Sequence, residues 1–169
     1  MSQSNFFSDD LMATAAALLD SARAQRLKIV SAESCTGGLI AALLTEIPGS
    51  SDVLERGYVT YSNVAKVECL GVSAQLIEQH GAVSREVALG MVDGAVKHAH
   101  ADLGVAVTGV AGPDGGTAQK PVGCVHIAVH RKGHLTRHKE YQFGNIGRSA
   151  IRLATVREAL ALIEKMIEN

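Results

Sequence analysis

The chain has 169 residues, of which 47% are hydrophobic and 20% are charged. This length can bury one core but not two ordinary ones, so we expect a single domain over residues 1–169, with residues 1–7 as a flexible tail. Sixteen basic residues against seventeen acidic ones, no tryptophan and few other aromatic residues argue against a nucleic-acid partner.

No apolar run is long enough to span a membrane, and the first residues lack the charged and apolar regions of a signal peptide. We therefore expect no membrane partner. The three cysteines, Cys35, Cys69 and Cys124, are odd in number and widely spaced, which favours neither a disulfide framework nor a zinc site. They fit a reducing compartment, and we expect a cytoplasmic protein.

Helices and strands are predicted to alternate along the chain. Apolar residues at helical spacing, with breakers between them, predict helices over 8–25, 38–47, 63–70, 73–80, a longer stretch from 84 that includes Val96, and 148–168. Short apolar or alternating runs predict strands over 27–31, 56–62, 103–108, 122–130 and 135–143. Asn63 and Ser84 are the expected N-caps of their helices.

Helices between the early strands, followed by a late hairpin, indicate an α/β protein. We predict a single-domain α/β/α sandwich with a mixed, mostly parallel sheet of about five strands and a C-terminal hairpin. Two glycine-bearing loops, 34–38 and 109–116, each follow a predicted strand. Ligands of such sheets bind beyond the carboxyl ends of the parallel strands, so these two loops are expected to meet there.

The first of these loops carries hydroxyl and thiol groups at the start of a helix, in the sequence Ser-Ala-Glu-Ser-Cys-Thr-Gly-Gly over residues 31–38. Backbone N–H groups and the helix dipole would bind a phosphate there, or stabilise an oxyanion beside a nucleophile such as Ser34. The alternative is a plain strand-to-helix turn with polar caps. Ser34 fits neither G-x-S-x-G nor Ser-x-x-Lys, so any base must come from another segment.

Lys66 is a candidate for that base. It lies in the first turn of a predicted helix, where the helix dipole and partial burial both favour a neutral amine. A neutral lysine can accept the proton of a serine hydroxyl. The alternative for a single lysine is a solvated surface charge.

Several ordered motifs at matching intervals resemble the C-terminal domain family of the competence/damage-inducible protein CinA. The resemblance runs from about Leu11 to the C-terminus. It is carried by Ala-Glu-Ser-Cys-Thr-Gly-Gly at 32–38, Gly-Ser-Ser at 49–51, Arg-Gly-Tyr-Val-Thr-Tyr-Ser-Asn-Val-Ala-Lys at 56–66, His-Gly-Ala-Val-Ser at 80–84, Thr-Gly-Val-Ala-Gly-Pro-Asp-Gly-Gly at 108–116 and Lys-Pro-Val-Gly at 120–123.

The resemblance implies a nicotinamide mononucleotide deamidase of pyridine-nucleotide recycling, which releases nicotinate mononucleotide and ammonia. By motif it places the nucleophile at Ser34, the general base at Lys66, and Tyr61 beside them. The protonated Lys66 would pass its proton to the departing ammonia directly or through the Tyr61 hydroxyl. This chemistry needs no metal and no cofactor.

Substrate binding is expected at backbone amides and at one arginine. The candidate residues are Thr36, Gly37, Gly38, Thr108, Gly109, Ala111, Gly112 and Arg148. The segment that leads to Arg148, Phe-Gly-Asn-Ile-Gly-Arg at 143–148, is one residue longer than the family pattern. A surface cation in the first helical turn is therefore the alternative for Arg148.

Other interpretations stay open at this stage. Cys35 could replace Ser34 as the nucleophile, because a thiol at a helix N-terminus has a lowered pKa. The histidines at 126, 130, 134 and 138 recur every four residues, but a hairpin with that spacing does not predict a metal site. The protein could also be a non-catalytic nucleotide- or partner-binding module, or an amidase of another small amide. We expect a homo-oligomer, a dimer or larger.

Overall fold

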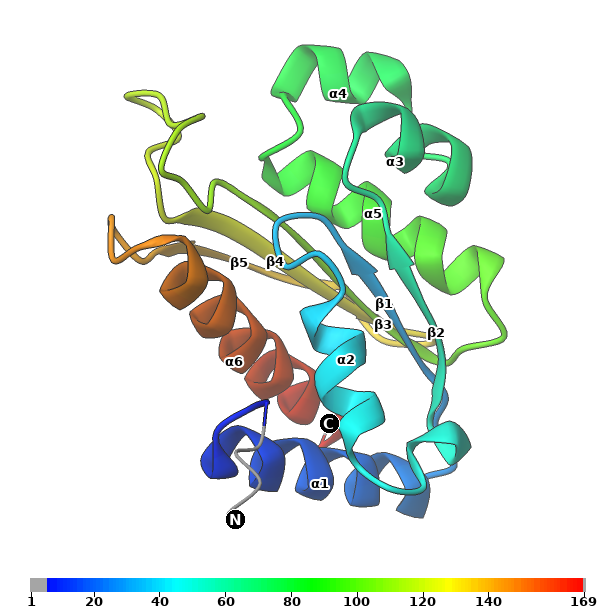
Figure 1. Ribbon diagram of the computed structural model, residues 1–169. Helices are drawn as coiled ribbons and strands as arrows, with labels where there is room; N and C mark the ends of the chain where they lie inside the picture. The colour runs from blue at the N-terminus through cyan, green and yellow to red at the C-terminus, as the bar shows by residue number, and fades with distance from the viewer. Residues whose placement is uncertain (1–5, 169) are drawn as a thin grey trace.

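The computed structural model describes residues 6–168, which form one five-stranded sheet in the order β2-β1-β3-β4-β5 (Figure 1). The strands are β1 (Ile29–Glu33), β2 (Leu54–Val59), β3 (Leu103–Gly109), β4 (Cys124–Arg131) and β5 (Arg137–Gln142). β1 pairs in parallel with β2 and β3, whereas β4 is antiparallel to both β3 and β5. The predicted mixed sheet and the C-terminal hairpin are confirmed.

Helices cover both faces of the sheet (Figure 1). On one face lie α1 (Asp9–Ala24), α2 (Leu39–Glu46) and α6 (Arg148–Ile167), and on the other lie α3 (Asn63–Leu70), α4 (Ala74–His80) and α5 (Arg85–His98). A short 3₁₀ helix, η1 (Ser50–Asp52), leads into β2. This arrangement is the predicted three-layer α/β/α sandwich.

Each face of the sheet carries its own apolar core, because the central strands are buried on both sides. In β1, Ile29 packs with α1, α2 and α6, while Val30 and Ala32 pack with α5. Two polar residues, Ser31 and Glu33, are also fully buried in this strand. Glu33 is therefore a charged side chain in an apolar sheet, and its partners decide the local structure.

Element boundaries differ from the expected ones by a few residues, as in β2, which was expected over 56–62. Two further details also differ from the sequence-based expectations. Phe7, which was placed in a flexible tail, is buried and packs into the core beneath α1; residues 1–5 of that tail lie outside the described residues. The N-cap of α3 is Ser62 and not Asn63, because the Ser62 hydroxyl accepts a hydrogen bond from the N–H of Ala65 at 3.0 Å. The N-cap of α5 is Ser84, as predicted.

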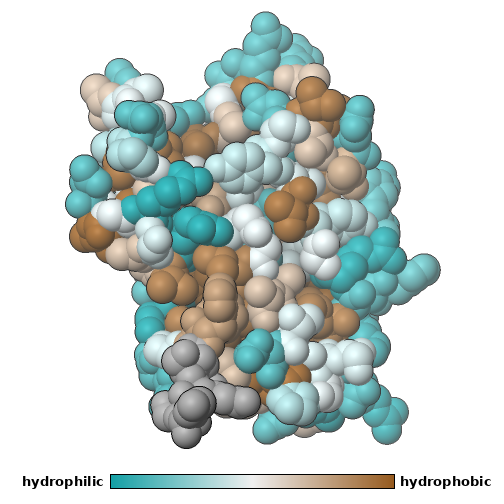
Figure 2. All heavy atoms as spheres, viewed as in Figure 1, coloured by the Kyte–Doolittle hydropathy of each residue, from teal (hydrophilic) through white to brown (hydrophobic). Residues whose placement is uncertain are grey.

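Figure 2 shows the same view as a surface, with apolar side chains gathered over α2 and α6 among hydrophilic ones. Leu153 of α6 keeps 40% of its surface exposed, and Val59 and Val64, at the end of β2 and in α3, are also exposed. Within residues 6–168 no helix is both long enough and apolar enough to cross a membrane.

The contact between α3 and α5 gives a stability prediction. A methyl group on Gly94 would overlap the carbonyl oxygen of Leu70, whereas one on Gly90 of the same helix would meet only side chains at 3.6 Å. We expect Gly94→Ala to lower the free energy of unfolding by roughly 1–3 kcal/mol or more, because the two helices must move apart. Gly90→Ala is the control and should leave it unchanged or raise it by up to about 1 kcal/mol. Urea unfolding followed by circular dichroism measures both, and equal midpoints would contradict the prediction.

Candidate active site

The turn between β1 and α2 is built around the buried carboxylate of Glu33. This carboxylate accepts hydrogen bonds of 2.7–3.1 Å from the hydroxyls of Ser31 and Thr36 and from the backbone N–H groups of Gly38, Ile40 and Ala41. All of these partners are donors, so the ionised form of the side chain satisfies them. The negative charge also lies at the positive end of the α2 dipole, which stabilises both.

Arg152 of α6 holds the same turn from the other side. Its guanidinium donates to the carbonyl oxygens of Cys35 at 3.2 Å and Thr36 at 2.9 Å. Gly37 and Gly38 have positive φ angles of 60° and 97°, which L side chains rarely adopt. The turn is therefore fixed by its glycines, by Glu33 and by Arg152, and Ser34 at its start has a defined position.

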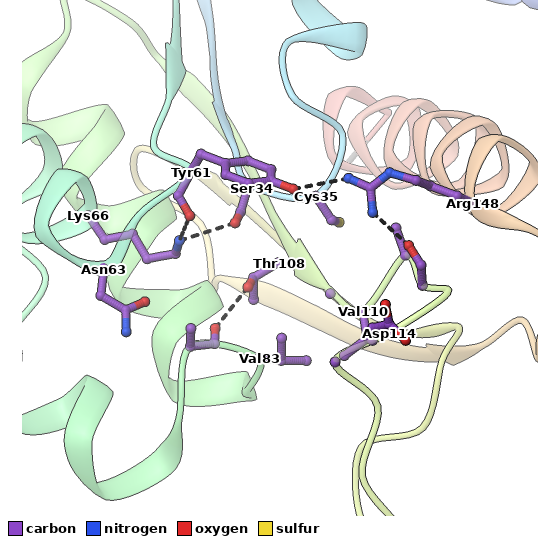
Figure 3. Close-up of a pocket in the computed structure, with 15 residues that line it drawn as sticks. Ser34, Cys35, Tyr61, Asn63, Lys66, Val83, Thr108, Val110, Asp114 and Arg148 are labelled. Carbon is purple, nitrogen blue, oxygen red and sulfur yellow. Dashed lines mark hydrogen bonds between the residues drawn. The ribbon is translucent and has the colours of Figure 1, made fainter.

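Ser34 and Lys66 meet directly, although they are 32 residues apart (Figure 3). The Nζ of Lys66 lies 3.1 Å from the Oγ of Ser34. It also donates to the carbonyl oxygen of Thr60 at 2.8 Å and, at 3.4 Å, to that of Tyr61. α3 supplies this lysine, and the register of β1 and β2 brings the start of α3 beside the end of β1. The predicted pairing of serine and lysine is thus present in the structure.

The environment of Lys66 favours the neutral amine. Only 1% of the side chain is exposed, and no carboxylate within residues 6–168 forms an ion pair with it. Burial lowers the pKa of Lys66, because the charged form loses its hydration and gains no anion in return. A surface lysine, the alternative considered for this residue, is excluded by this burial.

Cys35 lies next to Ser34 in sequence but packs into the core between the sheet and α6. Burial raises the pKa of its thiol to about 12, so the thiol stays protonated and weakly nucleophilic. This burial argues against Cys35 as the nucleophile, because the helix N-terminus does not compensate for the loss of solvent around the thiol.

A pocket of about 270 Å³ opens over the Ser34 hydroxyl. It is lined by Ser34, Cys35, Tyr61, Asn63, Lys66, Ala82, Val83, Thr108, Gly109, Val110, Ala111, Gly112, Asp114, Gly115 and Arg148. The loops after β1 and after β3 meet here, at the carboxyl ends of two neighbouring parallel strands, as predicted. Of the candidate residues from the second loop, Thr108, Gly109, Ala111 and Gly112 all reach the pocket.

Arg148 also reaches this pocket, despite the longer segment before it. Its guanidinium donates to the carbonyl oxygen of Gly112 at 2.7 Å and to the hydroxyl of Tyr61 at 3.0 Å (Figure 3). Tyr61 therefore turns its hydroxyl toward Arg148, and only its backbone carbonyl contacts Lys66. A proton path from Lys66 through the Tyr61 hydroxyl is not present in this conformation.

Three expected substrate-binding residues are not at the pocket. Thr36, Gly37 and Gly38 do not line it. Thr36 is fully buried and, together with the N–H of Gly38, binds Glu33. The cause is that their donors are already used: Glu33 binds the Thr36 hydroxyl and the Gly38 N–H, and the Gly37 N–H donates to the carbonyl oxygen of Ser34 at 3.0 Å. In contrast, the N–H of Ala111 makes no hydrogen bond within the described part of the chain, so it is available to a ligand.

Comparison with known proteins identifies the family of the chain. The profile of the CinA C-terminal domain matches residues 11–167. The chain belongs to the CinA C-terminal domain family. A CinA-like protein of Syntrophus aciditrophicus is 47% identical over 144 residues, which is 85% of this chain and 34% of that protein. A putative competence-damage inducible protein of Acetivibrio thermocellus is 49% identical over 83% of this chain and 34% of its own. The chain thus spans about a third of the length of these relatives.

Solved structures of CinA proteins share the whole fold. The competence/damage inducible protein CihA from Agrobacterium tumefaciens superposes with a TM-score of 0.95 at 46% identity, covering 98% of this chain and all of that one. A CinA superfamily protein from Escherichia coli gives a TM-score of 0.87 at 32% identity, covering 99% of this chain and 96% of that one.

Sequence reasoning missed two residues that position the CinA-family site, Glu33 and Arg152. Glu33 lies five residues before the predicted start of the helix at residue 38, and the observed N-cap of α2 is Gly38, so no ordinary capping pattern marks Glu33. Arg152 lies four residues after Arg148, and this spacing places both on one face of a helix. The contact partners of Arg152, two carbonyl oxygens of a distant turn, carry no sequence signal.

A substitution at Glu33 tests its structural role. In Glu33→Gln an amide NH₂ replaces one acceptor oxygen and faces buried donors, so we expect the free energy of unfolding to fall by roughly 3 kcal/mol. Glu46→Gln, at the exposed end of α2, is the control and should change it by less than about 0.5 kcal/mol. Chemical denaturation measures both. A Glu33→Gln protein as stable as the wild type would show that the turn does not depend on this charge.

Proposed function

We propose that this protein is a hydrolase that deamidates nicotinamide mononucleotide to nicotinate mononucleotide and ammonia, in the recycling of pyridine nucleotides. The observation that carries the proposal is the buried Lys66 amine 3.1 Å from the Ser34 hydroxyl, at the floor of an open pocket. A binding module has no need for a desolvated base beside a serine. The substrate follows from the motif resemblance to CinA-type deamidases, since the names of the relatives describe competence and damage and not a reaction.

In the first half of the proposed reaction, the Oγ of Ser34 attacks the carboxamide carbon while the Nζ of Lys66 accepts the hydroxyl proton. The carbonyl oxygen becomes an oxyanion, for which the free N–H of Ala111 is a candidate donor. The carbon–nitrogen bond then breaks, and ammonia leaves with the proton that Lys66 returns. An acyl ester on Ser34 remains.

The second half removes the acyl group. Lys66, neutral again, accepts a proton from a water molecule, and the resulting hydroxide attacks the ester carbon. The ester bond to Ser34 breaks, the serine oxygen regains the proton from Lys66, and nicotinate mononucleotide is released. The cycle balances with one water consumed and needs neither metal nor redox chemistry.

Recognition of the mononucleotide is proposed at the other end of the pocket. The substrate phosphate is a dianion near neutral pH, and Arg148 supplies a guanidinium that is exposed and already oriented by Gly112 and Tyr61. Backbone groups of the loop from Gly109 to Gly112 line the same wall. We place the reaction in the cytoplasm, which the three unpaired thiols of the protein support.

The nucleophile is tested by Ser34→Ala. We expect this variant to lose ammonia release from nicotinamide mononucleotide while keeping the wild-type unfolding midpoint, because only one oxygen is removed from a packed turn. Ammonia is measured with a coupled assay on purified protein. Wild-type-like turnover in Ser34→Ala would exclude the serine mechanism. Wild-type protein that binds the mononucleotide but releases no ammonia from it would favour the binding module.

The general base is tested by Lys66→Arg and by the pH profile of the wild type. Activity should rise with pH through the lowered pKa of Lys66, because only the neutral amine accepts the serine proton. Arginine stays protonated, so Lys66→Arg should lose roughly a hundredfold to ten-thousandfold in kcat. Binding of the mononucleotide, measured by calorimetry, should remain within about tenfold. A parallel loss of binding and kcat would assign Lys66 to positioning instead.

We further propose that the protein is a homo-oligomer, a dimer or larger. The exposed apolar side chains of Val59, Val64 and Leu153 support this proposal, because contact with a second copy would remove them from water. Light scattering after size exclusion at micromolar concentration should give at least twice the chain mass of 17.7 kDa. A monomer mass would contradict it.

A further inference from the structure

A second group of chemically reactive side chains lies outside the catalytic pocket, on the hairpin of β4 and β5. Cys124, His126 and Glu140 each offer a ligand atom, and these atoms all lie within 4.8 Å of one another. The Sγ of Cys124 is 3.9 Å from the Nε2 of His126. None of the three residues lines the pocket over Ser34, so the proposed deamidation leaves this cluster unexplained.

Strand register explains why these residues meet. Cys124 and His126 are two apart on β4 and therefore point to the same face of the sheet. Glu140 of β5 is the direct cross-strand partner of His126, so its side chain is on that face as well. The hairpin thus brings three side chains together from positions that spread over seventeen residues of sequence, 124–140.

Two further side chains orient the cluster. The Nδ1 of His126 lies 3.0 Å from the Nε2 of His138, which leaves the Nε2 of His126 facing Cys124. The amide of Gln142 donates to the Oε1 of Glu140 at 2.7 Å. A histidine that binds a metal through one ring nitrogen usually has its other nitrogen held by a neighbour, and ligand carboxylates are commonly held in the same way.

We propose that Cys124, His126 and Glu140 form a binding site for a divalent transition-metal ion, with Zn²⁺ as the best match. Thiolate, imidazole and carboxylate are the ligands that zinc takes in proteins, and a water molecule completes a tetrahedron. Zinc–sulfur and zinc–nitrogen bonds of ordinary length require a sulfur–nitrogen separation of about 3.6 Å, near the 3.9 Å observed. On binding, the Cys124 thiol gives its proton to the solvent and the thiolate coordinates the ion.

The burial of the three side chains suits a metal site in which two ligands are fixed by the surrounding protein and the third is accessible to an ion from solvent. Cys124 and His126 are buried, with 1% and 7% of their surface exposed, whereas Glu140 is exposed. The ion would reach the buried pair from the Glu140 side and would connect the first residue of β4 to β5. His126 is also the cross-strand partner of Thr108, a pocket residue, so the ion would brace the sheet behind the catalytic pocket without entering it.

The experiment uses the full-length protein with any affinity tag removed, stripped with a chelator and then dialysed. Titration with Zn²⁺ by calorimetry should give one site per chain, and saturation should raise the thermal unfolding midpoint by several degrees. Co²⁺ in place of Zn²⁺ should give the near-ultraviolet charge-transfer band of a thiolate ligand. These measurements do not depend on the enzymatic activity, so they stand or fall separately from the proposed deamidation.

Matched variants identify the ligands. Glu140→Gln, at an exposed position, should weaken Zn²⁺ binding by at least tenfold, and His138→Gln should weaken it by about 10–100-fold through the loss of an orienting partner. Cys124→Ser should abolish the cobalt band, and its fold is checked by circular dichroism. The controls Glu68→Gln, Cys69→Ser and His134→Gln change exposed residues of the same types elsewhere and should bind like the wild type.

Three outcomes would overturn the proposal. The first is wild-type protein that takes up no Zn²⁺ at a defined stoichiometry. The second is bound Co²⁺ without a thiolate band, which would place the ion away from Cys124. The third is Glu140→Gln with unchanged affinity, and this variant decides the question even if Cys124→Ser does not fold.

Discussion

The carboxylate of Glu33 is the constraint on which the site depends. An anion in a fully buried strand is tolerated only where donors surround it, and here the first turn of α2 supplies three backbone N–H groups while Ser31 and Thr36 supply hydroxyls. The chain must therefore turn into a helix directly after β1. Ser34 lies inside that turn, so the hydrogen bonds that surround the Glu33 carboxylate also determine the position of Ser34.

Lys66 is also buried, but its surroundings do not stabilise its charge as those of Glu33 do. Glu33 is surrounded by donors that stabilise its charge. Lys66 has a hydroxyl and two carbonyl oxygens as hydrogen-bond partners and forms no ion pair within residues 6–168. Both side chains lose water, but only one of them gains partners that stabilise its charge. The five donors around Glu33 compensate for that loss, whereas nothing compensates for it at Lys66, so burial lowers the pKa of the amine and gives it its capacity to accept a proton.

Most features that depend on neighbouring residues were predicted correctly from the sequence, whereas several that depend on contacts between distant segments were not. Hydrophobic periodicity predicted the six α-helices and the five strands of the described residues, with boundaries displaced by a few residues, because burial of apolar side chains decides element type. The short 3₁₀ helix η1 was not predicted. The capping residue of α3 was missed by one position, since Ser62 and Asn63 are both good caps and only backbone geometry distinguishes them. Thr36 and Gly38 were expected to bind substrate because the pattern does not show that Glu33 occupies their donors first.

The amino-acid sequence by itself determined the α/β fold class, the two loops at the carboxyl edge of the sheet and the pairing of Ser34 with Lys66, the last through motifs that resemble CinA. Only the tertiary structure decided which thiols and amines are buried. The Cys35 thiol is buried beside the pocket, Lys66 lost its water, and Cys124, His126 and Glu140 came together across a hairpin. Desolvation and cross-strand contact depend on what packs against a side chain, and no local pattern of residues contains that information.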